Sequence, residues 1–118
     1  MKLLLPHPAA VEFPPEVLEG HYRGHIPPGH RLRGLDLGDD HYLELSHGYE
    51  MPEDDCVGGT ITHKKSDGSW CQGWIGFDAG FGPPIWSVES WDPLSCSPSF
   101  LCHCGDHGFI KSGRWVRA

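Results

Sequence analysis

The stretch SFLCHCGDHGFIKSGRW, residues 99–115, decides how this chain is interpreted, because it gathers cysteines and histidines around glycine-containing turns. In an extended segment Cys102 and Cys104 point to the same side, since side chains alternate with a period of two residues. Gly105 then lets the chain turn, and His107 can approach the same point. Two sulfurs and one imidazole nitrogen suit Zn²⁺, so we predict a structural zinc site containing Cys102, Cys104 and His107.

A tetrahedral zinc site needs a fourth ligand, and the sequence leaves more than one candidate open. Cys56 lies in the turn-rich stretch EDDCVGG, His47 ends a predicted strand, and Cys96 precedes Cys102 across a Ser-Pro loop. A ligand from the middle of the chain would tie that part to the C-terminal end, so we rank Cys56 first and His47 as its alternative. Cys71 lies in a tryptophan-rich strand, where we expect it to belong to the core.

The same residues allow two other interpretations. Free thiols in a tight hairpin are one, because the spacing C-x-C departs from the usual C-x-x-C pair. A metal-dependent hydrolase is the other: three ligands would leave a position open for water, with Asp106 or Glu50 as the base. The chain lacks the H-E-x-x-H motif and the zinc-deaminase motif, so we expect a non-enzymatic protein.

The composition predicts a small, mainly β fold rich in turns. The chain has 118 residues, of which 16 are glycine and 11 proline, and its five tryptophans argue against disorder. A small chain with this much glycine and proline has few residues left for an apolar core. Such a chain often needs a cross-link or a metal to hold its fold. We therefore expect one compact domain over 1–118, with an irregular arm over 1–33 and a β core over 41–118 that ends in a zinc-ribbon-like C-terminal hairpin.

Alternation of polar and apolar residues predicts short antiparallel strands, and no window of a dozen residues has helical periodicity. Within the arm, PPEVLEG can form one helical turn from Pro15 to Gly20. We expect the histidines of the arm to face solvent; these are His7, His21, His25 and His30. Strands are predicted at 41–50, 59–65, 70–78, 85–91, 100–104 and 109–116, with a hairpin turn at 66–69 and a loop at 92–99.

Charge and cysteine content indicate the cellular compartment of the protein and the classes of partner that it does not bind. The net charge is −7, and an acidic surface repels phosphate backbones, so we do not expect nucleic acid as a partner. Five cysteines cannot all pair within one chain, which favours a reducing compartment. No apolar stretch is long enough to span a bilayer, and MKLLLPHPAA is too short for a secretory signal. We expect a cytoplasmic protein with a protein partner and no membrane contact.

The C-terminal third, residues 86–116, resembles a family of small bacterial and phage proteins described only as a domain of unknown function. The matching pieces are Ser97-Pro98-Ser99, Cys104, His107, Phe109-Ile110 and Gly113. The resemblance implies a zinc site shared with a cysteine-rich strand nearer the N-terminus. In this chain the corresponding strand is LELSHGYE, which carries His47 and no cysteine pair.

No reaction follows from the resemblance, although some relatives sit beside genes for ubiquitin-like conjugation and many are carried by phages. The sequence predicts a small acidic interaction protein held together by zinc, and the resemblance implies that a phage encodes it and that it acts in the bacterial cytoplasm. The alternatives are a metal-dependent hydrolase or an accessory of ubiquitin-like conjugation with an open zinc site, and a thiol redox protein.

Overall fold

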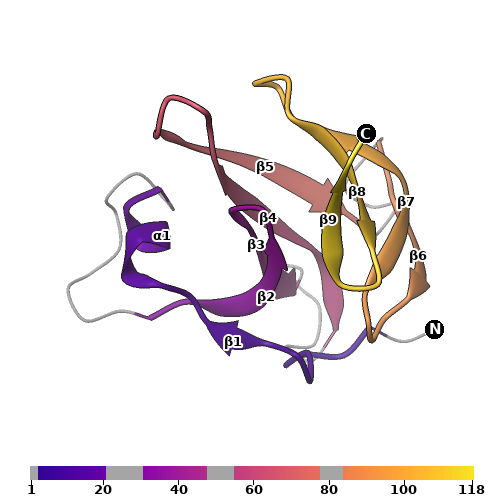
Figure 1. Ribbon diagram of the computed structural model, residues 1–118. Coiled ribbons are helices and arrows are strands. Elements are labelled where there is room, and N and C mark those ends of the chain that lie inside the picture. Colours follow the sequence, from indigo (N-terminus) through magenta and orange to yellow (C-terminus); the bar gives the residue numbers. More distant parts are fainter. Residues whose placement is uncertain (1–2, 21–30, 48–54, 78–83) are drawn as a thin grey trace.

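Two antiparallel sheets form the computed structural model, which describes residues 3–20, 31–47, 55–77 and 84–118 (Figure 1). In these residues the first sheet has the order β1-β2-β3-β4-β5 and the second the order β6-β7-β8-β9. The mainly β, single-domain prediction is confirmed. The elements are β1 (Val11–Glu12), α1 (Pro15–Gly20), β2 (Arg33–Gly38), β3 (His41–His47), β4 (Cys56–Lys64), β5 (Trp70–Gly76), β6 (Ser87–Ser90), β7 (Ser95–Leu101), β8 (His107–Lys111) and β9 (Arg114–Arg117).

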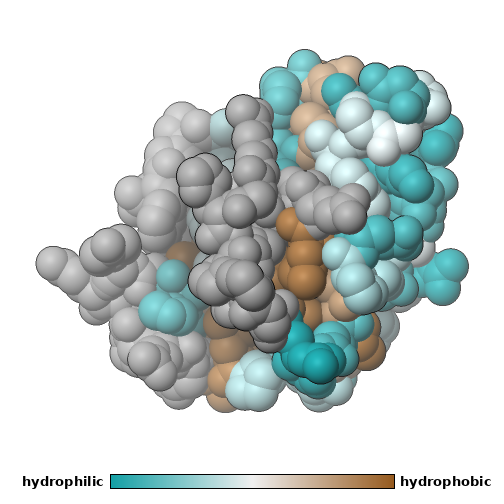
Figure 2. Space-filling model, turned by 90° about the vertical axis from the view of Figure 1, so that its left-hand side faces the viewer, coloured by the Kyte–Doolittle hydropathy of each residue, from teal (hydrophilic) through white to brown (hydrophobic). Residues whose placement is uncertain are grey.

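The main apolar core contains side chains from both sheets. Alternation along each strand sends every second residue inward, and burying one large aliphatic side chain contributes about 1.5–3 kcal/mol. Hydrophobic residues also gather in a narrow band on the face drawn in Figure 2, beside a broad hydrophilic surface. The core includes Leu43, Ile61 and Ile75 from the first sheet and Phe100, Ile110 and Trp115 from the second.

A smaller core surrounds α1 and explains why β3 is more buried than its alternating pattern predicts. The helix begins at Pro15 and ends at Gly20, as expected. Its Val17 is fully buried and packs with Phe13, Leu32 and Tyr42. The β3 strand therefore begins with buried residues on both faces, and its first residue, His41, is only 2 % exposed.

The prediction of a loop over 92–99 is wrong, because strand β7 begins within this range, at Ser95. The side chains of Cys96 and Phe100 are buried in the main core, which favours a strand here. Pro98 has no N–H to donate to a neighbouring strand, and the register of β7 with β8 shifts between Cys96 and Phe100 to accommodate it. This strand ends at Leu101, so Cys102 and Cys104 lie in the β7–β8 turn and not on a strand.

The arm's first histidine differs from the expectation, since His7 is 3 % exposed. Its Nδ1 accepts a hydrogen bond from the Ala9 N–H at 3.0 Å, and its Nε2 donates to the Trp91 carbonyl at 2.5 Å. Both ring nitrogens are thus satisfied, which removes the main cost of burying an imidazole. The remaining histidines of the arm lie outside the described residues; these are His21, His25 and His30.

Candidate metal centre

A row of three buried side chains crosses the first sheet on one face. His63 in β4 lies directly opposite His41 in β3 on one side and directly opposite Cys71 in β5 on the other. Residues paired in this way have Cβ atoms about 4.5–5.5 Å apart and share a face. All three side chains are buried, at 9 % exposure or less. The register of the sheet therefore places an imidazole and a thiol side by side.

The β7–β8 turn brings two further thiols to this row. The Cys102 N–H donates to the Asp106 carbonyl at 2.8 Å, and the Gly105 N–H donates to the Cys102 carbonyl at 2.8 Å. Gly105 has a φ of 99°, which a residue without a Cβ adopts at no steric cost. Figure 1 shows the β4–β5 hairpin and the β7–β8 turn at the same end of the molecule. Cys102 is buried and Cys104 is exposed.

Four ligand atoms meet here, those of His63, Cys71, Cys102 and Cys104, all within 4.8 Å of one another. The Cys102 sulfur lies 3.6 Å from the Cys71 sulfur and 3.4 Å from His63 Nε2, and the Cys104 sulfur lies 3.6 Å from the same nitrogen. Ligand bonds of 2.0–2.3 Å to a tetrahedral ion place ligand atoms about 3.3–3.8 Å apart. The cluster has the size and composition to hold a single metal ion.

Burial sets the protonation of the buried ligands. It lowers the pKa of His63, despite the opposing effect of the Asp106 carboxylate, and so favours the neutral imidazole that binds metals. It raises the pKa of Cys102 to about 12, so this thiol keeps its proton until a metal displaces it. Metal binding at this cluster therefore releases protons.

A second group, His41, His63 and Asp106, shares one histidine with the cluster. Asp106 Oδ2 lies 2.5 Å from His41 Nε2, which is too short for two ligands of one ion, since ligand atoms around a tetrahedral ion are more than 3 Å apart. The same oxygen lies 3.7 Å from His63 Nδ1. This group is a hydrogen-bonded pair, His41 and Asp106, that lies beside the ligand His63, and not a second metal site.

His103 borders the exposed side of the cluster. Its Nε2 lies 3.6 Å from the Cys71 sulfur, and its Nδ1 lies 3.8 Å from the Cys102 sulfur. Both distances are within reach of an N–H···S hydrogen bond, which stabilises thiolate character on a ligand sulfur. Because Cys104 is exposed as well, the cluster lies at the molecular surface and not in the deep core.

Cys102 and Cys104, both predicted as ligands, belong to the cluster, whereas His107 lies outside it. His107 is the first residue of β8, and its side chain is exposed. Its Nε2 pairs with the Ser99 hydroxyl at 2.7 Å. The imidazole of the cluster comes instead from His63, which the sheet already holds opposite Cys71.

The two candidates for the fourth ligand lie at the other end of the sheet. His47 and Cys56 are paired residues of β3 and β4, and six residues of strand separate Cys56 from His63, a distance of about 20 Å. Burial raises the pKa of Cys56, whose thiol donates to the Gly58 carbonyl at 3.3 Å. Cys96 is likewise a core thiol, and burial raises its pKa to about 12. The cluster contains Cys71 in place of the fourth ligand expected from Cys56 or His47.

The sequence reasoning missed His63 and Cys71, although a signal for them exists. The turn at 66–69 is closed by Asp67 Oδ1, which accepts a hydrogen bond from the Ser69 N–H at 2.9 Å. The Lys65 N–H donates to the Ser69 carbonyl, so the hairpin is centred on Asp67. This centre places His63 opposite Cys71, whereas a hairpin centred on the predicted turn at 66–69 would place it opposite Gln72. A histidine and a cysteine on the two arms of a predicted hairpin, within one position of symmetry, are therefore the signal that indicates a shared site.

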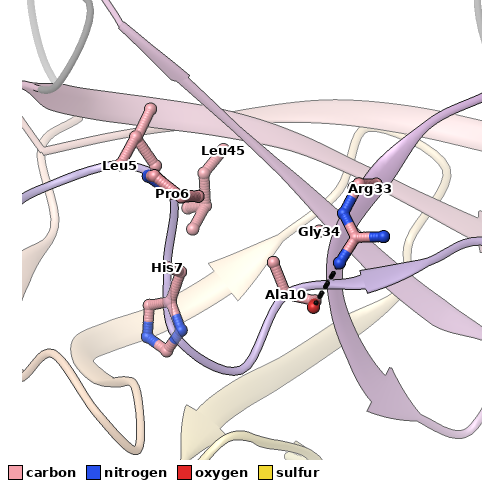
Figure 3. A pocket seen from close by; sticks show the side chains of 7 residues that line it. All are labelled: Leu5, Pro6, His7, Ala10, Arg33, Gly34 and Leu45. Carbon is pink, nitrogen blue, oxygen red and sulfur yellow. Dashed lines mark hydrogen bonds between the residues drawn. The ribbon is translucent and has the colours of Figure 1, made fainter.

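A separate cavity of about 480 Å³ lies between the N-terminal segment and strands β2 and β3 (Figure 3). Its walls are largely apolar, and the Arg33 guanidinium donates to the Ala10 carbonyl at 3.2 Å. The cavity shares no lining residue with the metal cluster; it is lined by Leu5, Pro6, His7, Ala10, Arg33, Gly34 and Leu45.

Comparisons of the chain with protein-family models, with curated proteins and with solved structures found no match. Within the described residues, α1 has only six residues, and no helix has the length and apolar character that a membrane crossing requires. The chemistry of the site therefore carries the functional argument.

Proposed function

We propose that this protein binds one Zn²⁺ through His63, Cys71, Cys102 and Cys104, and that the ion serves the fold. The observation that carries the proposal is the convergence of one imidazole and three thiols within 4.8 Å. Three cysteines and one histidine are a common ligand set of structural zinc, and soft sulfur ligands disfavour magnesium and calcium.

The positions of the ligands support a structural role. His63 and Cys71 belong to the first sheet, and Cys102 and Cys104 belong to a turn of the second. An ion bound by all four would link the two sheets at one end of the shared core. Structural zinc contributes about 10–16 kcal/mol of apparent binding free energy in small domains, which is comparable to the whole stability of a domain of this size.

In this proposal the protein is a non-enzymatic interaction module whose partner is another protein. A complete set of four protein ligands leaves no position for a reacting water, which catalytic zinc requires. The net charge of −7 supports a protein partner over nucleic acid. The exposure of Cys104 is the one observation that favours the alternative, a hydrolase or conjugation accessory in which this ligand leaves and opens the ion to substrate.

Chelation distinguishes a structural ion from a catalytic one. Purified protein is analysed for metal content, and its unfolding is then followed by tryptophan fluorescence before and after a strong chelator is added. We expect one zinc per chain and loss of the cooperative unfolding transition on chelation. A protein that keeps its transition after losing the ion would contradict the structural role, and a metal-free folded protein would contradict zinc binding itself.

A further inference from the structure

We infer that Asp106 and His41 are positioning residues that orient the metal ligand His63, and this inference rests on the zinc site proposed above. An imidazole binds a metal through one nitrogen, and the other nitrogen then carries a hydrogen that needs an acceptor. In His63 the nitrogen facing the sulfurs is Nε2, so Nδ1 is the one that must donate. The Asp106 carboxylate faces Nδ1 at 3.7 Å, which is longer than a direct hydrogen bond, and we infer that the two atoms approach when His63 binds the ion.

His41 holds this carboxylate in place. Its Nε2 lies 2.5 Å from Asp106 Oδ2, and its Nδ1 lies 2.6 Å from the Asp39 carbonyl oxygen. The ring is held at both nitrogens, so it cannot rotate without losing both contacts. Asp39 in the β2–β3 turn is thereby connected, through His41 and Asp106, to the ligand His63.

Ring stacking fixes the plane of the two imidazoles. His41 lies between Trp115, at 4.2 Å and 13°, and His63, at 5.0 Å and 7°. All three rings are at most 6 % exposed, so packing allows them little freedom. The ligand His63 therefore has its ring plane set by His41, and its Nδ1 faces the Asp106 carboxylate.

Asp106 also contacts the ligand turn through its backbone. Its carbonyl accepts from the Cys102 N–H and so closes the turn that carries both cysteines of the second sheet. One residue thus joins the ligand turn to the two histidines of the first sheet. These contacts within the protein hold His63 and the ligand turn in position before the ion binds. The site is therefore preorganised for metal.

The test measures zinc affinity by competition with a chromophoric chelator. We expect Asp106→Asn, which keeps the shape of the side chain, to weaken zinc binding by about 10–100-fold. We expect His41→Phe, which keeps a ring against Trp115 but not the bond to Asp106, to weaken it by about tenfold. Asp67→Asn is the matched control, since in the described part of the chain Asp67 bonds to Ser69 of its own turn; the zinc affinity of this variant is expected to stay within about twofold of the wild type.

Two spectroscopic readouts separate positioning from a loss of stability. The visible spectrum of the Co²⁺-loaded protein reports ligand geometry, and we expect it to change in Asp106→Asn and not in Asp67→Asn. In the zinc-loaded wild type, ¹⁵N NMR of the histidines is expected to show His63 bound through Nε2 with a hydrogen on Nδ1. This second measurement needs no variant, so binding through Nδ1 would overturn the inference even where a variant does not fold.

The outcomes distinguish the inference from the proposed function. A wild-type protein that binds no zinc contradicts the proposed function. A wild type that binds zinc, together with Asp106→Asn and His41→Phe of unchanged affinity and an unchanged Co²⁺ spectrum, overturns the positioning role and leaves the zinc site standing. The same holds if His63 is bound through Nδ1.

Discussion

His63 and Cys71 are directly paired residues of β4 and β5, and both contribute ligand atoms to the same four-residue cluster. Seven residues separate them in sequence, and the hairpin alone brings them together. The other two ligands, Cys102 and Cys104, share one turn in the same way. Each sheet thus supplies half of the ligand set, and contact between the sheets completes it.

Substitution of the ligands tests the assignment directly. Zinc stoichiometry, measured by elemental analysis, is expected to fall from one per chain to below one half in His63→Ala and Cys71→Ser. It is expected to stay at one in His107→Ala and Cys56→Ser, because these residues lie outside the cluster. Loss of zinc from His107→Ala, with zinc retained in His63→Ala, would show that the ligand set is wrong.

Zinc affinity is expected to rise with pH. Burial raises the pKa of Cys102 to about 12 and lowers the pKa of His63, so in the metal-free protein this thiol is protonated and the imidazole is neutral at pH 7. Binding therefore releases up to about three protons, one from each thiol, and lowering the pH opposes it. Calorimetry in buffers of different ionisation enthalpy measures the number released. Binding without proton release would mean that thiolates are not the ligands.

The Phe100 ring packs so closely against Gly73 that a side chain at this position would disturb the core beside the metal site. A Cβ at this position would lie 2.6 Å from the Phe100 ring and 3.5 Å from the Cys102 sulfur. We expect Gly73→Ala to lower the free energy of unfolding of the zinc-loaded protein by about 1–3 kcal/mol, measured by chemical denaturation. Gly76→Ala is the matched control on β5, since the nearest atom to its Cβ would be Trp74 Nε1 at 3.1 Å, a longer contact than the 2.6 Å at Gly73. Equal stability of the two variants would contradict this packing.

His7 anchors the N-terminal segment to the second half of the chain without contributing to the metal site. His7→Ala leaves the Ala9 N–H and the Trp91 carbonyl without their partner, so we expect a loss of about 1–3 kcal/mol in unfolding free energy. Zinc content is expected to stay at one per chain. Leu4→Ala in the same segment is the control, because Leu4 is 43 % exposed. A His7→Ala variant as stable as Leu4→Ala would show that the anchor contributes nothing.

The sequence predicts most strands correctly because alternation and turn residues are local signals. The strand that includes Leu43 and the hairpin turn at 66–69 both follow from their own residues. The burial of Tyr42 does not, since α1 covers it only after the chain has folded back. His7 was expected in solvent for the same reason: its partner Trp91 is 84 residues away.

The candidate site was half predictable. Cys102, Cys104 and Gly105 reveal a ligand turn because their spacing is local. The expectation that His107 joins them assumed that the turn continues, whereas β8 begins at His107 and its side chain is exposed. Cys71 was interpreted as a core residue, and its burial agrees with that, yet burial and metal ligation are compatible. Only the register of β4 with β5 shows which thiol faces His63.

The ligand set itself is most directly measured by X-ray absorption at the zinc edge of the metal-loaded protein. This account predicts four ligands, three sulfur atoms at about 2.3 Å and one nitrogen at about 2.0 Å. The spectrum of Cys71→Ser is expected to lose one sulfur, and that of Cys56→Ser to match the wild type. A zinc ion with two sulfur ligands and the remainder nitrogen or oxygen, or a folded protein that takes up no zinc at all, would contradict it.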